Sequence, residues 1–157
     1  MMDRDFQLVP MQIQMVTAIQ EIRDCVPICE RYGLSLSEAD IKELVSARKA
    51  ALADSGRIEF KGGILPKLIY AFSDSPYVNN ENWVEILTEL QEAFYYYKGD
   101  AEERFTDDEL IEFMVRVFNG RAQGSAEYLI ETSLAALCRY ARQQYDEHDA
   151  EDSGDLF

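Results

Sequence analysis

Apolar residues recur at intervals of three and four along most of the chain, which is the spacing of one face of an α-helix. The first such stripe comprises Met11, Met15, Ala18, Ile19, Ile22, Val26 and Cys29. Pro27 lies inside this stripe, and proline removes a backbone donor and clashes with the preceding turn. The pattern therefore predicts two short helices here, over residues 11–24 and 26–32.

Residues typical of helix ends divide the rest of the chain into further short helices. Ser37 is suited to cap a helix N-terminus, and Thr106 forms a Thr-x-x-Glu capping box with Glu109. Gly56 follows the last apolar position of the stripe that begins after Ser37, where a left-handed residue is favoured. Trp83 opens a strong stripe that continues through Ile86, Leu87, Leu90, Phe94 and Tyr97. We therefore expect Trp83 to lie in the core.

Only the segment Arg57–Gly63 shows the alternation of apolar and polar residues that extended chain produces. Ile58 and Phe60 alternate there with three charged residues, and two glycines follow. The sequence thus predicts an all-α fold, an orthogonal array of six to eight short helices, with at most one very short extended turn near Ile58–Phe60. A length of 157 residues suits one domain, which we place at residues 1–145.

The charge of the chain narrows the range of partners. The formal net charge is −15, which repels phosphate backbones and anionic membranes. Six of the last twelve residues are acidic, so we expect residues 146–157 to form a disordered tail. No apolar run approaches the roughly 20 residues of a membrane span. Nucleic acid and membrane are therefore not expected as partners.

The three cysteines are odd in number and accompany no secretion signal, which is typical of reduced thiols in the cytoplasm. Cys25 and Cys29 share a helix face, but the only histidine, His148, falls in the acidic tail, so we predict neither a metal site nor a cofactor. The chain contains no nucleophile elbow, P-loop or dinucleotide motif. We name no catalytic residue and favour a protein that is not an enzyme.

The most distinctive local feature of the sequence is a set of basic residues that lie beside glycines. A helix N-terminus after glycines can hold an anion, because its N–H groups are unpaired and carry partial positive charge. The candidates are Arg57, Lys61, Gly62, Gly63, Lys67 and Arg121. The alternative is that these glycines simply mark helix ends and the basic residues are solvated or form salt bridges, with no ligand.

Tyrosines form a second group of candidates. Three consecutive tyrosines cannot all face one core, because each residue turns a helix by about 100°. An exposed ring among them suits a protein contact surface. The candidates are Tyr70, Tyr77, Tyr95 and Tyr96. A wide core with amphipathic rings at its rim is the alternative.

Three stretches resemble a known protein family: GRIEFKGGILPKLIYAFSDSPY (Gly56–Tyr77), FYYYKGD (Phe94–Asp100) and DDELIEFM…FNGRAQGS (Asp107–Ser125). Over about Tyr32–Ser125 the chain resembles a family of small uncharacterised bacterial proteins of unknown function. The resemblance implies a bacterial cytoplasmic protein and supplies no activity or ligand.

Two functions stay open at this point. The first is a non-enzymatic protein-binding or regulatory module that meets another protein or a second copy of itself. The second is a small-molecule or anion-binding domain, or a cryptic enzyme, centred on Arg57–Lys67 and Arg121. Convergence of those cations on one concavity would favour the second.

Overall fold

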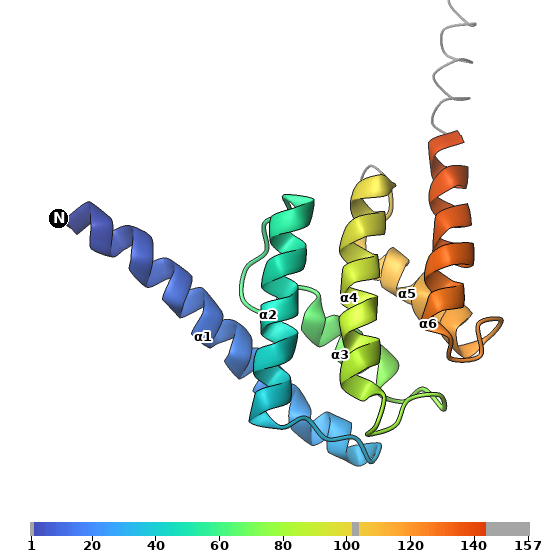
Figure 1. Cartoon of the computed structure of the whole chain (residues 1–157), viewed down its shortest axis with the longest axis horizontal. Helices are drawn as coiled ribbons and strands as arrows, with labels where there is room; N and C mark the ends of the chain where they lie inside the picture. The colour runs from blue at the N-terminus through green and yellow to red at the C-terminus, as the bar shows by residue number, and fades with distance from the viewer. Residues whose placement is uncertain (1, 102–103, 144–157) are drawn as a thin grey trace, which may run out of the picture. The chain divides into compact units, whose positions relative to one another are not determined.

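The computed structural model describes residues 2–101 and 104–143, with side chains from residue 15 onward. It is 72% helical with six α-helices, labelled α1–α6 in Figure 1, and contains no strand within the described residues. The predicted all-α class is confirmed. The acidic tail predicted over residues 146–157 lies outside the described residues. No described helix combines the length and apolar character that a membrane crossing requires.

The chain divides into two compact units, the first ending at Glu92 and the second beginning at Ala93. The first unit comprises α1 (Met2–Arg31), α2 (Glu38–Ser55), α3 (Leu65–Phe72) and the start of α4 (Trp83–Asp100), and α1 packs against both α2 and α3. Its most buried side chains are Ala18, Ile22, Cys29, Ile41, Leu44, Leu65, Leu68, Ile69, Phe72, Trp83, Leu87 and Leu90. Trp83 has no exposed surface, so its predicted place in the core is confirmed.

The predicted break at Pro27 is wrong, because α1 runs through it as one helix. A proline in a helix leaves the carbonyl four residues earlier, here that of Arg23, without its N–H partner. Pro27 and Arg23 are both exposed, so that carbonyl lies on the solvent side of the helix. Packing of the opposite face against α2 and α3 outweighs the local preference of proline.

The predicted helix caps at both ends of α2 are present. The Ser37 hydroxyl accepts a hydrogen bond from the Asp40 N–H at 3.0 Å, and the Asp40 carboxylate accepts one from the Ser37 N–H at 2.9 Å. Gly56 ends the helix with a φ of 72°. The capping box of Thr106 and Glu109 forms in the same reciprocal way at the start of α5 (Asp107–Asn119). These local signals placed both helices correctly.

The second unit contains the end of α4, then α5, α6 (Ala126–Tyr128), the π-helix η1 (Leu129–Leu134) and α-helical residues 135–143. Its core comprises Phe94, Leu110, Met114, Phe118, Leu129, Leu134 and Cys138. A π-helical turn disturbs the regular backbone hydrogen-bond ladder. The hydroxyl of Tyr97 donates a hydrogen bond to the carbonyl of Ile130 at 2.9 Å, which stabilises this turn from α4.

Candidate functional site

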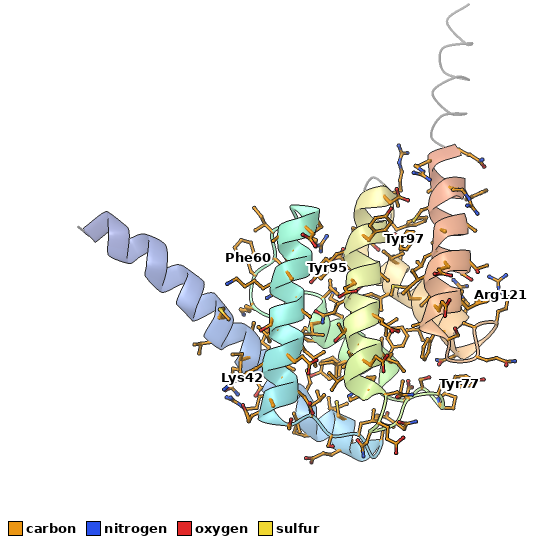
Figure 2. All side chains as sticks on the ribbon, in the orientation of Figure 1. Lys42, Phe60, Tyr77, Tyr95, Tyr97 and Arg121 are labelled. Atoms are coloured by element: carbon orange, nitrogen blue, oxygen red, sulfur yellow. The ribbon has the colours of Figure 1, made fainter. Side chains whose placement is uncertain are left out.

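The segment from Arg57 to Phe60 joins α2 to the turn before α3 and is neither helix nor strand. Ile58 is 82% exposed and Phe60 is 72% exposed, whereas the side chain of Glu59 between them is only 4% exposed. Phe60 is labelled in Figure 2, beside α2. The alternation seen in the sequence is therefore real, but the charged side chain faces inward and the apolar ones face solvent. We call residues 57–60 the inverted segment.

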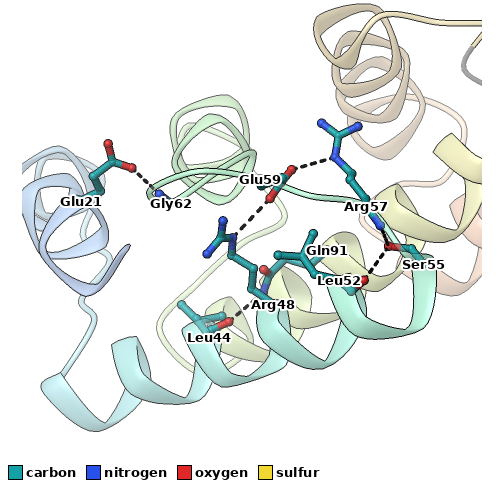
Figure 3. Close-up of polar contacts among 9 residues, drawn as sticks. All are labelled: Glu21, Leu44, Arg48, Leu52, Ser55, Arg57, Glu59, Gly62 and Gln91. Carbon is teal, nitrogen blue, oxygen red and sulfur yellow. Dashed lines mark hydrogen bonds and ion pairs between the residues drawn. The ribbon is translucent and has the colours of Figure 1, made fainter. Parts of the chain in front are cut away.

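Two arginines hold Glu59 in this position (Figure 3). Arg48 on α2 donates a hydrogen bond from Nε to Oε1 of Glu59 at 3.3 Å, and Arg57 donates from Nε to Oε2 at 3.0 Å. The Arg48 side chain is 9% exposed. A buried carboxylate is costly unless cations and hydrogen bonds satisfy it, and here both oxygens are satisfied. Because side chains alternate along extended chain, pairing Glu59 inward turns its two neighbours outward.

The two glycines that follow make room for carboxylates of the chain itself. Gly63 has a φ of 61°, and a Cβ there would collide with the Glu59 carboxylate. The N–H of Gly62 donates to Oε2 of Glu21 on α1 at 2.6 Å, and a Cβ on Gly62 would lie 2.6 Å from the same oxygen. Close approach without a Cβ is what glycine permits. The anion that meets this corner is therefore the carboxylate of Glu21.

The predicted cations separate into three groups. Arg57 is engaged with Glu59, as described above. Lys61 and Lys67 are both exposed, and Lys61 has a φ of 56°, a left-handed conformation that is unusual for lysine. Arg121 is exposed in the second unit, between α5 and α6. Of the six predicted ligand-binding residues, Arg57 and Gly63 lie together around Glu59. Gly62 instead donates its N–H to Glu21.

A cavity of about 140 Å³ opens beside the inverted segment and contains one of the predicted cations, Lys61. We call it the α1–α2 cavity, because its walls come from α1, from α2 and from the connection that follows α2. It is lined by Met15, Val45, Arg48, Lys49, Leu52, Glu59 and Lys61. Three cations and one carboxylate thus share a small apolar hollow in a chain whose net charge is −15.

The predicted tyrosine surface is divided between the two units. Tyr70 and Tyr77 in the first unit are 48% and 37% exposed, and Tyr96 in the second is 65% exposed. Tyr95 is only 2% exposed and packs edge-on against Phe94, with ring centroids 5.5 Å apart. Tyr95 therefore belongs to the core of the second unit and offers little surface to a partner.

The three cysteines are buried and unpaired. Burial raises the pKa of the Cys25 and Cys29 thiols, and the hydrogen bond with Tyr70 opposes this rise at Cys25. Burial raises the pKa of Cys138 to about 11. Such thiols are almost fully protonated at neutral pH and are poor nucleophiles. Within the described residues, no three potential metal ligands come together.

Comparison with known proteins identifies the family of this chain. The model of a family of unknown function, DUF6323, matches residues 21–147, which is more than half of the chain. The chain belongs to this family. The match contains the stretch Tyr32–Ser125, so the resemblance to a family of unknown function is confirmed. No curated protein and no solved structure matches the chain.

In this DUF6323 member, sequence reasoning missed Arg48 and Lys49, which line the α1–α2 cavity. One signal was present. Arg48 occupies a position on the buried stripe of α2, seven residues after Ile41 and four after Leu44. A charged residue at a stripe position requires an internal partner, and Glu59 is the partner that the structure supplies.

Proposed function

We propose that this DUF6323 member is a non-enzymatic binding module that contacts another protein through the inverted segment. The observation that carries the proposal is the orientation of that segment, with Glu59 inside and Ile58 and Phe60 outside. Single exposed apolar residues are ordinary on protein surfaces. Ile58 and Phe60 are two large apolar residues, and the buried pairing of Glu59 with two arginines holds both of them toward solvent. Exposure of this apolar area has no benefit for folding, so we attribute it to binding.

We include two exposed apolar residues of α1 in the proposed surface. Met15 is 41% exposed and lines the same cavity as Glu59, and its neighbour Val16 is 67% exposed. We define the docking surface as Met15, Val16, Ile58 and Phe60. Exposed apolar residues of this kind suit a protein–protein contact, in which the buried centre is apolar.

The charge of the chain indicates which kind of protein fits. A net charge of −15 repels a second copy of the same chain and attracts a basic protein at long range. We therefore propose a partner that is basic overall and presents an apolar patch to the docking surface. The three unpaired cysteines support a reducing compartment, so we propose that the encounter takes place in the cytoplasm.

Photo-crosslinking from position 60 tests this proposal. A benzophenone amino acid replaces Phe60, and the same replacement at Tyr140, which is 59% exposed in the second unit, is the matched control. In cells that make the protein, we expect position 60 to crosslink to one basic protein that position 140 does not capture. Excess wild-type chain should compete for this product, and chain carrying Ile58→Ser and Phe60→Ser should not.

Three results would contradict the proposal. These are equal products from both positions, competition by the doubly substituted chain as strong as by wild type, and a product that consists of two copies of this chain. The third result would retain the docking surface but replace the basic partner with self-association. Far-UV circular dichroism of the doubly substituted chain checks that it keeps its helices.

A further inference from the structure

We infer that the α1–α2 cavity binds a small organic carboxylate that carries an apolar body of about the size of a benzene ring. The inference concerns a site of its own and does not depend on the protein partner proposed above. It rests on the charge of the cavity wall, the state of its arginine and the size and polarity of the hollow.

The charge in the cavity is not balanced from within. Among the described residues that line it, Glu59 is the only carboxylate, and its two oxygens already accept hydrogen bonds from Arg48 and Arg57. Lys49 and Lys61 are exposed, and neither makes an ion pair with a described residue. Two lysines thus line a hollow in which no described carboxylate is left to pair with them. In a chain of net charge −15, this is a local excess of positive charge.

Arg48 adds a directed binding group. Its side chain is 9% exposed and lines the cavity. The one hydrogen bond of this side chain to a described residue runs from Nε to Glu59. The terminal nitrogens Nη1 and Nη2 therefore keep donors for a ligand. A guanidinium presents these donors as a planar fork that matches a carboxylate, so Arg48 can orient the ligand while the lysines supply charge.

The remaining wall is apolar. Met15, Val45 and Leu52 line it. The volume of about 140 Å³ is close to the roughly 150 Å³ of an engineered apolar cavity that accepts benzene. An inorganic anion would leave the apolar wall uncovered, and a hydrocarbon would leave the cations without a counter-charge. A carboxylate attached to a ring or a short aliphatic chain satisfies both parts of the wall.

Phenylacetate is the probe for a test by NMR titration of the ¹⁵N-labelled full chain. We expect saturable shifts of the backbone resonances of Val45, Lys49, Leu52 and Lys61. Acetate lacks the ring and phenylacetamide lacks the charge, so each should bind at least about tenfold more weakly, because the loss of one good contact changes affinity by this order.

Two single substitutions test the cations without disturbing the fold. Lys61→Asn removes the charge and suits a left-handed φ, and Lys49→Gln changes an exposed position of α2. Each should weaken phenylacetate about fivefold, as expected for loss of a partly exposed ion pair. Lys42→Gln is the matched control, because Lys42 is exposed on α2 (Figure 2) and is not among the described residues that line the cavity.

Each other outcome overturns the inference. Equal affinity for phenylacetamide would mean that the cations do not take part, and equal affinity for acetate would mean that the apolar wall does not. Shifts that do not saturate, shifts spread over the second unit, or equal weakening by Lys42→Gln would indicate a general charge effect. None of these outcomes depends on whether crosslinking from position 60 succeeds.

Discussion

Removal of the Glu59 carboxylate should strongly destabilise the first unit. Glu59→Gln keeps the size of the side chain but leaves Arg48 as a cation that is 9% exposed and has lost its charged partner. Breaking a buried ion pair by removing one partner typically costs about 3–5 kcal/mol. We expect the lower end, about 3 kcal/mol, because Arg57, the second partner of Glu59, is 22% exposed and can turn to solvent.

The magnitude can be read from thermal unfolding of the full chain. For a chain of this length, 1 kcal/mol shifts the midpoint by about 2–4 °C, so we expect Glu59→Gln to lower it by about 6–12 °C. Trp83 is the only tryptophan and is fully buried in the first unit, so its fluorescence reports unfolding of that unit directly. The exposed pair of Arg23 and Glu38, at 2.8 Å, supplies the control, and Glu38→Gln should leave the midpoint unchanged.

A double substitution distinguishes a lost ion pair from a general defect. Arg48→Met with Glu59→Leu removes both charges and keeps apolar volume, and such replacements are often neutral or stabilising. We therefore expect the double variant to be more stable than Glu59→Gln. The reasoning fails if Glu59→Gln unfolds within 1–2 °C of wild type, or if the double variant is as unstable as the sum of its single changes, since independent sites add.

Three further predictions follow from burial and capping. Trp83→Ala should cost about 3–5 kcal/mol, as large-to-small core changes do, and solvent-like tryptophan emission from the native protein would contradict burial. Because the pKa of Cys138 is raised to about 11, and that of Cys25 is also raised, both should react with Ellman's reagent at pH 8 far more slowly in native than in denatured protein. Two hydrogen bonds with Thr106 lower the pKa of Glu109, the larger effect coming from the backbone N–H and the smaller from the hydroxyl. The Glu109 carboxylate therefore adds stability at pH values above its ordinary pKa, and this stability is lost as pH falls through its lower pKa in the folded protein. Thr106→Ala should raise the pKa of Glu109 part of the way back in an NMR titration, and an unchanged value would show that the hydroxyl does not contribute.

The fold could be predicted where its signals are local. Ser37, Gly56 and Thr106 act within a few residues of themselves, through hydrogen bonds to their own helix ends, and the sequence shows these spacings directly. Pro27 shows the limit of such reasoning. Its local preference is to end a helix, and the contacts that keep α1 continuous come from α2 and α3, which lie elsewhere in the sequence.

The candidate site was harder to predict because alternation does not say which side faces inward. Ile58 and Phe60 are the residues that a half-buried strand would place in its core, and Glu59 is the one that it would expose. Their positions are reversed because Arg48, eleven residues earlier, occupies a buried position of α2. The pairing of Arg48 with Glu59 becomes visible only when the fold places α2 beside the inverted segment, and the sequence alone does not predict that they lie close together.

The carboxylate site that we propose therefore lies beside the position predicted from the sequence, in the α1–α2 cavity. Gly62 and Gly63 do admit carboxylates to the backbone, but these are the carboxylates of Glu21 and Glu59. These internal acids bind Gly62 and Arg57, whereas Lys61 lines the α1–α2 cavity together with Arg48 and Lys49. The same buried pair that turns Ile58 and Phe60 toward solvent, where we propose that a protein partner binds, also fixes Arg48 in the cavity wall. Loss of Glu59 should thus impair both surfaces at once, whereas Lys61→Asn should affect the cavity alone.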